Sequence, residues 1–430
     1  MRILILGSAP NKTVERIAIH FTSDVNRKNK NELDLVIRED RKNYFIQKKI
    51  FKTVFGLTDD VFNLETEHAI ALANRLNNDL YHYIVIVRPE VKKDHAFDNV
   101  IGFAQALNSR QLIIMDQNLE AHPVKRLKKK RSIEEMIGDH WDESTHFPLP
   151  ERVRFWQSPY ILTHINRLLT GDPQKNYIDL IRSRSNNRVF DRAVSVGCGS
   201  GGLEINLVKS GIVKGFDLFD LSPKRIAQGE KSARELGVSQ AIRFYKSDPF
   251  DSIEPGSVDL VFWHSSLHHM PDAGAAIEWS FKILKNGGMF YMNDFVGPSR
   301  FQWSDNLLSN ANRIRGSIPG RYFKNPYSND GILPREIKRP NPGLVRLNDP
   351  SEAADSSRIL SSLLNYFPGA EIIRLGGIVY YLVLNDVLHN YDESTPADRD
   401  ALDQLLKQDE AFAQNPEEEN LYAAAVAFKN

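Results

Sequence analysis

Residues 193–220 read AVSVGCGSGGLEINLVKSGIVKGFDLFD, and this stretch decides the fold. The apolar run over residues 193–196 indicates a short buried strand, and a glycine-rich turn follows it directly. Residues 203–208 then have the apolar spacing of a helix. A strand, a glycine turn and a helix in this order form a nucleotide pocket, because the turn lets a ligand approach the backbone and the helix start offers free N–H groups.

A carboxylate follows at the end of the next predicted strand. Residues 213–219 are mostly apolar and end at Asp220, which is placed to accept both hydroxyls of a ribose. Asp217 is an odd number of positions away in the same strand, so we expect it to face the other way and to be structural. The glycine spacing itself fits dinucleotide-binding enzymes and S-adenosylmethionine enzymes equally well, and it leaves both classes open.

The segments that follow carry a family resemblance. Three more strands are predicted over residues 242–245, 258–263 and 289–293, and the second is followed by HSSLHH. The series resembles bacterial class I S-adenosylmethionine-dependent methyltransferases, through the segments GCGSGG, FDLSPKRI, SDPFD, DLVFWHSSLHH and LKNGGMFYMNDF. The resemblance implies an α/β fold with a Rossmann-like sheet, which is parallel except for one antiparallel strand near the C-terminus.

The resemblance also implies S-adenosyl-L-methionine as the cofactor. The residues that would bind it follow the ends of the predicted strands: Gly197, Cys198, Gly199, Gly201, Asp220, Leu221, Asp248, Pro249, Phe250 and His264. One of them departs from the family pattern, because a proline at position 249 has no N–H to donate to the adenine ring. We expect Phe250 to supply that donor instead.

Three residues are candidates for catalysis. His268 and His269 follow the fourth strand at the sheet edge where open α/β sheets bind ligands, and either is a candidate general base. The alternative is that one of them only braces a loop. Asp294 ends the fifth strand and is the second candidate for base or acceptor ligand, while Arg300 is a candidate for an anionic acceptor or a structural ion pair. No metal site is predicted, because no cysteine accompanies the histidines and no second ligand pair has suitable spacing nearby.

The chain is predicted to contain two domains. Residues 1–122 alternate strands with helices, which indicates a smaller Rossmann-like α/β domain of unknown role. Residues 123–150 include the basic run KRLKKKR and then several acids, and they are predicted to form a charged linker. Residues 151–430 form the methyltransferase domain, with an irregular insertion at about 300–349 that we expect to be a substrate lid.

Composition limits the classes of partner and the compartment. Lysine plus arginine equals aspartate plus glutamate at 55 each, which argues against nucleic acid as a partner. The single cysteine allows no disulfide within the chain and suits a reducing compartment. The apolar start, MRILIL, is too short for a signal peptide, and no run approaches the length of a membrane span. We therefore predict a cytoplasmic protein, with its oligomeric state left open.

The predicted function is methyl transfer to a small-molecule or carbohydrate acceptor, at an oxygen atom. Proteins with this resemblance often have surface-polysaccharide functions, which favours carbohydrate slightly. Two alternatives stay open: an NAD(P)-dependent oxidoreductase with the same glycine turn, and a module that binds S-adenosylmethionine without catalysis. The predicted final strand over residues 421–428 disfavours the oxidoreductase if it is antiparallel.

Overall fold

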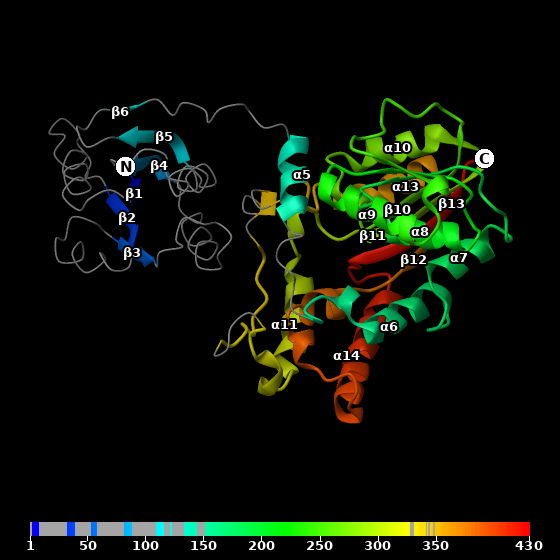
Figure 1. Ribbon diagram of the computed structural model, residues 1–430. Helices are drawn as coiled ribbons and strands as arrows, with labels where there is room; N and C mark the ends of the chain where they lie inside the picture. The colour runs from blue at the N-terminus through cyan, green and yellow to red at the C-terminus, as the bar shows by residue number, and fades with distance from the viewer. Residues whose placement is uncertain are drawn as a thin grey trace. The chain divides into compact units, whose positions relative to one another are not determined.

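The computed structural model divides the chain into two compact units, residues 1–131 with 343–347 and residues 132–342 with 348–430 (Figure 1). We describe each unit by itself. The described residues are 2–7, 32–38, 53–57, 81–87, 109–115, 121–122, 133–143, 151–326, 331–340, 342, 345–346 and 349–430.

The first unit contains a six-stranded sheet in the order β3-β2-β1-β4-β5-β6. The strands pair in parallel except for the last pair, β5 with β6. Strands are predicted from the sequence over residues 2–6, 33–37, 83–87 and 111–115, and all four are present, whereas β3 and β6 were not predicted. The predicted helices of this unit lie outside the described residues. The strands are β1 (Arg2–Gly7), β2 (Glu32–Arg38), β3 (Thr53–Leu57), β4 (Tyr81–Val87), β5 (Ser109–Met115) and β6 (Ala121–His122).

The second unit contains a seven-stranded sheet in the order β12-β13-β11-β10-β7-β8-β9. All neighbours pair in parallel except β13, which runs antiparallel between β11 and β12 (Figure 1). The predicted Rossmann-like sheet, parallel except for an antiparallel final strand, is therefore confirmed. The strands are β7 (Ala193–Val196), β8 (Phe216–Phe219), β9 (Ile242–Tyr245), β10 (Val258–His264), β11 (Leu284–Phe295), β12 (Glu371–Arg374) and β13 (Tyr422–Phe428).

Helices cover both faces of this sheet, which explains why its central strands are apolar throughout. In β10, Leu260 and Phe262 belong to one core cluster, and Val261 and Trp263 belong to the other. The first cluster includes residues of α6 (Pro159–Thr170), α7 (Tyr177–Arg184), α8 (Gly202–Lys209), α11 (Asp305–Ser317) and α14 (Pro396–Gln414). The second includes residues of α10 (Ala273–Ile283) and α13 (Ile359–Tyr366).

Three segments differ from the sequence-based expectation. Within the predicted linker, residues 133–143 form the helix α5 (Ile133–Glu143), which packs against α9 (Pro223–Glu235) of the second unit. One helix is predicted from the sequence over residues 350–366, but α13 (Ile359–Tyr366) begins later, because the Asp349 carboxylate accepts the N–H and the hydroxyl of Ser351 and holds this segment in a turn. The apolar run after residue 377 permits a helix or a strand, and it forms the π-helical turn η7 (Ile378–Val383). Among the described helices, none is long and apolar enough to cross a lipid bilayer.

The contact between α9 and the glycine turn generates a stability prediction. A Cβ at Gly229 of α9 would lie 2.5 Å from the backbone oxygen of Ser200 and 2.6 Å from the ring of Phe244. We expect Gly229→Ala to destabilise the second unit by about 1–3 kcal/mol, because the helix must move away from the turn. The measurement is urea unfolding followed by tryptophan fluorescence, which reports on this unit because all five tryptophans lie between residues 141 and 303.

Gly316→Ala is the matched control. This glycine lies in α11 with open space around its Cβ position, so alanine is expected to leave stability unchanged or raise it by up to about 1 kcal/mol. Equal changes in the free energy of unfolding for Gly229→Ala and Gly316→Ala would show that the close contact at Gly229 does not determine stability.

Candidate active site

A cleft of about 1300 Å³ opens at the carboxyl ends of β7, β10 and β11. Its walls combine residues that are far apart in sequence: the glycine turn, the short helix η3 (Leu267–His269), residues 333–340 and residues 375–386. Six of the predicted site residues line it, namely Gly197, Cys198, Gly199, His264, His268 and His269. The cleft therefore joins the expected cofactor turn and the expected catalytic histidines in one space.

The glycine turn has a backbone that other residues rarely adopt. Gly197, Gly199 and Gly201 have φ angles of +66°, +58° and +69°, in the left-handed region. A Cβ at Gly197 would lie 2.9 Å from the Cβ of Ser266, and one at Gly201 would lie 2.8 Å from Leu218. The turn therefore requires glycine for both conformation and packing, and it exposes backbone to the cleft where a ligand can approach closely.

Asp220 holds this turn to the end of β8. Its carboxylate accepts the N–H groups of Gly199 at 2.7 Å and Ser222 at 2.8 Å. Burial raises the pKa of Asp220, although these N–H donors oppose the shift. Asp217 faces away from this edge and binds Arg192 and Arg243, in agreement with the alternation of side chains along the strand.

The residues predicted to bind adenine lie at the neighbouring strand end. Asp248 is exposed and accepts the N–H of Phe250 at 3.2 Å, which closes a turn. The ring of Phe250 packs edge-on against Trp279 of α10, with ring centroids 5.1 Å apart. Pro249 is buried and Leu221 is half-buried. Their roles in cofactor binding stay predictions.

His264 and Cys198 are neutral residues of the cleft wall. The His264 ring lies between Phe262 and Tyr177, and burial lowers its pKa to about 4. Burial also raises the pKa of the Cys198 thiol well above its ordinary value, so the sulfur is a poor nucleophile.

Asp294 is the buried anchor of the opposite wall. Its carboxylate accepts the backbone N–H groups of Ser266 at 2.9 Å and Leu267 at 2.8 Å, and it binds Nδ1 of His268 at 2.5 Å. Burial opposes a charge on the imidazole, but the adjacent carboxylate outweighs it and raises the pKa of His268. The same pairing, with the backbone donors, lowers the pKa of Asp294 despite its burial. Asp294 thus fixes both the position and the orientation of His268.

His269 is held by a separate set of partners. Its Nδ1 lies 3.0 Å from the hydroxyl of Ser351, and that hydroxyl donates to the Asp349 carboxylate at 2.6 Å. Because the hydroxyl proton is used on Asp349, the serine oxygen accepts, and Nδ1 of His269 carries the hydrogen. Burial and the neighbouring charge of His268 lower the pKa of His269 well below its ordinary value.

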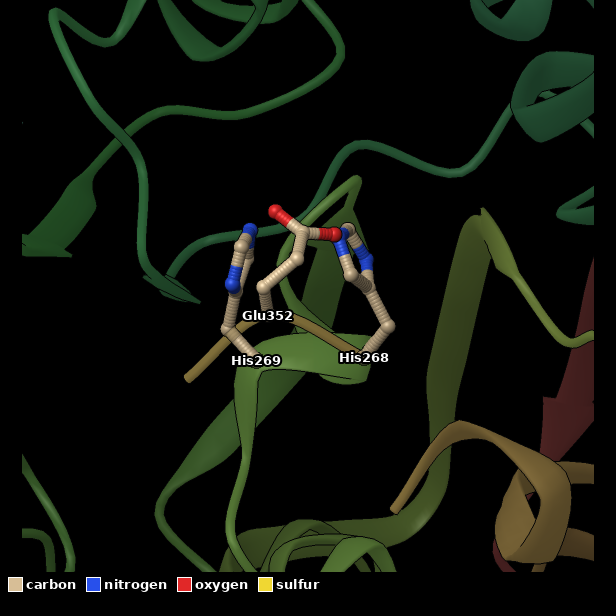
Figure 2. Close-up of side chains that lie close together, drawn as sticks. All are labelled: His268, His269 and Glu352. Atoms are coloured by element: carbon tan, nitrogen blue, oxygen red, sulfur yellow. The ribbon is translucent and has the colours of Figure 1, made fainter. Parts of the chain in front are cut away.

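Glu352 completes a cluster with these two histidines (Figure 2). Its carboxylate extends between the two imidazoles in the figure, with an oxygen 3.7 Å from Nε2 of His268. The guanidinium of Arg300 binds the backbone oxygens of Pro350 and Glu352, each at 2.8 Å. These contacts give Arg300 a structural role in holding the loop of Glu352.

Part of the second unit is similar to known methyltransferases. Residues 187–330 match the family model described as a methyltransferase domain. The 27-O-demethylrifamycin SV methyltransferase of Amycolatopsis mediterranei is 29% identical over 110 residues, which cover 25% of this chain and 40% of that protein. The ubiquinone biosynthesis O-methyltransferase of Methylococcus capsulatus is 31% identical over 103 residues, covering 24% of this chain and 42% of that protein.

Residues 187–330 therefore form a class I S-adenosylmethionine-dependent methyltransferase domain. The chain spans less than half the length of these two relatives. Among solved structures, geranyl diphosphate C-methyltransferase from Streptomyces coelicolor A3(2) is 13% identical, with 70% of this chain and 100% of that chain covered and a TM-score of 0.40.

The helix α5 covers part of the methyltransferase domain at the edge of the cleft. Trp141 lines the cleft, packs edge-on against His269 and lies under the guanidinium of Arg225, which is 4.6 Å from its ring centroid. A Cβ at Gly138 would lie 2.8 Å from the backbone oxygen of Leu221, so the helix approaches the end of β8 closely. The charged composition around α5 indicated a linker, and the tertiary contacts make it a wall of the site.

The insertion predicted as a lid supplies another wall. Residues 333–340 contribute most of its cleft-lining positions. Its arginines bind the insertion itself: Arg339 donates to the Trp303 oxygen at 2.7 Å, and Arg335 donates to the Ile318 oxygen at 3.1 Å. Whether this segment opens as a lid stays a prediction.

Several residues in and around the cleft were not predicted from the sequence. Glu204, Trp141, Ser351 and Glu352 were not among the candidates. A weak signal existed for the last two, since the run DPSE places two acids and a hydroxyl in one turn after an irregular segment. Nothing in the sequence indicated that this turn meets the histidines, because residues 268 and 352 are brought together by tertiary folding.

Glu204 generates a prediction about stability and pH. Its buried carboxyl accepts the Ser195 hydroxyl at 2.7 Å, and burial raises its pKa from 4.5 to about 7. Between these two pKa values the folded state binds more protons than the unfolded state. The stabilisation that Glu204 contributes to the folded state is therefore complete below about pH 4.5 and is lost as the pH rises through about 7.

We expect Glu204→Gln to remove this loss. The variant should gain about 3 kcal/mol relative to the wild type between pH 4.5 and pH 8, measured as urea unfolding of tryptophan fluorescence. Glu410→Gln, at a half-buried position of α14, is the control and should follow the wild-type profile. Parallel profiles for Glu204→Gln and the wild type would show that this carboxyl titrates normally.

Proposed function

We propose that this chain is an S-adenosylmethionine-dependent methyltransferase that methylates a hydroxyl group of a small, ring-bearing and largely apolar molecule. One observation carries the proposal: a single cleft connects the glycine turn of the methyltransferase domain with a histidine pair and an aromatic wall. When bound, S-adenosylmethionine supplies a methyl group that its positive sulfur already activates. The protein must then align the acceptor, exclude water and remove the hydroxyl proton.

The glycine turn is the proposed seat of the cofactor. Gly197, Cys198 and Gly199 line the cleft, and the side-chain-free turn leaves room for a ligand against the backbone. We assign the ribose to Asp220, which lies at the tip of the next strand and retains lone pairs beyond the two N–H groups it accepts. We assign the adenine to Leu221, Asp248, Pro249 and Phe250, and the border of the methyl-transfer site to His264.

The aromatic wall supports an acceptor with rings. Phe295, Phe301, Trp303 and Tyr381 line the cleft and pack against one another, with centroid separations between 5.3 and 6.4 Å. Phe295 also contacts the His268 ring, so the aromatic surface continues to the histidine pair. The names of the two relatives are consistent with this class, since one acts on 27-O-demethylrifamycin SV and the other serves ubiquinone biosynthesis.

The histidine pair is the proposed place of proton removal. Nδ1 of His268 faces Asp294 and Nδ1 of His269 faces Ser351. The Nε2 atoms are therefore the ring nitrogens on the other side, and that of His268 lies 3.7 Å from the Glu352 carboxylate. Asp294 acts as a positioning residue for His268, because its carboxylate is saturated by backbone donors and the imidazole.

Binding and turnover together test the proposal. Calorimetry of the full chain should show binding of S-adenosylmethionine and no comparable binding of NAD. Labelled methyl transfer is then followed with phenols, hydroquinones and hydroxylated macrocycles as one arm and with sugars and lipid-linked glycans as the other. Transfer to ring-bearing acceptors supports the proposal, transfer to glycans alone replaces its acceptor class, and binding without any transfer supports the non-catalytic module.

Asp220 offers the sharpest prediction for cofactor binding. Asp220→Ala is expected to weaken binding of S-adenosylmethionine at least tenfold, about 1.4 kcal/mol, because the ribose loses its acceptor. Asp220→Asn keeps an acceptor for the turn and separates loss of ribose binding from collapse of the turn. Asp191→Ala is the control, since Asp191 is exposed and precedes β7 at the opposite sheet edge. Unchanged affinity in folded Asp220→Ala would exclude the assigned ribose site.

A further inference from the structure

We infer that His268, His269 and Glu352 bind a divalent transition-metal ion in the cleft. One ligand atom from each of the three lies within 4.8 Å of the others (Figure 2). Two imidazoles with one carboxylate are a donor set that suits zinc, manganese or iron(II), and the remaining coordination positions are left for other ligands. The sequence analysis predicted no metal, because the carboxylate is supplied by a residue 83 positions beyond His269.

The free ring nitrogens are the ones that a metal needs. His268 donates Nδ1–H to Asp294, and His269 donates Nδ1–H to Ser351, which itself donates to Asp349. When both rings are neutral, the lone pair is on Nε2, the atom that would coordinate the ion. An imidazole whose other nitrogen donates to a carboxylate or hydroxyl is the usual second shell of a metal-bound histidine. General acid–base chemistry needs only one imidazole with a hydrogen-bond partner on Nδ1, whereas here both His268 and His269 have one.

The surrounding charge favours a cation. Three carboxylates face the two imidazoles: Asp294 at 2.5 Å and Glu352 at 3.7 Å from His268, and Asp349 at 3.8 Å from His269. Asp349 is 1% exposed, and its Oδ2 has no hydrogen-bond partner in the described part of the chain. A buried carboxylate oxygen without a donor is costly unless positive charge lies nearby. Nδ1 of His269 lies 3.8 Å and Nε2 of His140 lies 3.9 Å from this oxygen, both beyond hydrogen-bond distance, so a bound cation nearby would stabilise its charge.

The loop of Glu352 is fixed well enough to present a ligand. Arg300 binds the backbone oxygens of Pro350 and Glu352, and the N–H of Ala354 donates to the His268 oxygen at 3.0 Å. The carboxylate therefore approaches the histidines on a loop that is tied to the same short helix. The loop thus holds the carboxylate beside the two imidazoles, and small side-chain shifts would bring the three ligand atoms, now within 4.8 Å of one another, to the shorter separations found around a bound ion.

The site itself does not depend on the proposed methyl transfer, but its role does. An acceptor hydroxyl that coordinates the ion loses its proton more easily, because a cation stabilises the resulting oxygen anion. The proton leaves to solvent, the oxygen forms a bond to the methyl carbon, and the bond from that carbon to sulfur breaks, which turns the sulfonium into a neutral thioether. The ion would then replace a histidine as the means of activating the acceptor.

Direct metal binding tests the inference without any turnover. Tag-free full chain, freed of metal with a chelator, is dialysed against Zn²⁺, Mn²⁺ or Mg²⁺, and the bound metal is measured by mass spectrometry. Co²⁺ titration followed by visible absorption reports whether nitrogen and oxygen donors bind the ion. We expect one Zn²⁺ or Mn²⁺ per chain, with much weaker Mg²⁺ binding.

Three variants distinguish the site from incidental binding. Glu352→Gln removes a ligand and should raise the Zn²⁺ dissociation constant at least about 100-fold, whereas Ser351→Ala disturbs the orientation of His269 and should raise it about 10- to 100-fold. Glu336→Gln is the matched control, because Glu336 also lines the cleft but is exposed and pairs with Lys338. Thermal unfolding of each variant verifies that it is folded.

Two results would overturn the inference: wild-type chain that binds no stoichiometric transition metal, or equal affinity in Glu352→Gln and Glu336→Gln. Calorimetry with S-adenosylmethionine on the metal-free chain is measured in parallel. Cofactor binding without metal binding rejects the metal site and leaves the proposed function, with a histidine as base. Metal binding without cofactor binding supports the metal site and rejects the proposed function.

Discussion

The carboxylate of Asp294 is the interaction on which the site depends. It lies at the end of β11, fully buried, and it accepts backbone N–H groups from the turn that follows β10. One side chain thereby joins the carboxyl ends of two adjacent parallel strands and starts η3. Because the same carboxylate also binds His268, the position of the histidine pair is set by the register of the sheet.

Burial has opposite consequences for two carboxyl groups of this domain. Asp294 and Glu204 are both removed from solvent, yet the pKa of the first is lowered and that of the second is raised to about 7. Asp294 has an imidazole and several N–H donors, which stabilise its charge. Glu204 has the hydroxyl of Ser195, which compensates less for desolvation. Asp294 is therefore a charged anchor beside the histidines, whereas Glu204 is a readily protonated carboxyl beside the glycine turn.

The cleft is formed by segments added around a common sheet. The glycine turn and η3 come from the sheet edge itself, whereas α5, residues 333–340 and the loop of Glu352 are contributed by segments outside the β-α-β series. Their aromatic and charged side chains give the cleft its chemistry, while the sheet gives it its location. This division is consistent with a methyltransferase domain whose acceptor preference resides in its additions.

The sequence by itself determined the sheet and the turn. Short apolar runs, glycines that require positive φ, and an acid at a strand tip are local patterns, and they predicted β7 to β11 and the turn at Gly197 to Gly201. The antiparallel direction of β13 was implied by the family resemblance. The histidine pair and Asp294 were also found, because the carboxyl ends of parallel strands meet at one edge. Tertiary structure alone decided that Glu352 meets these histidines, that Arg300 serves the loop, and that α5 is a wall of the cleft. Those contacts join segments separated by tens of residues with no periodic pattern between them, so they depend on packing rather than on any local preference of the chain.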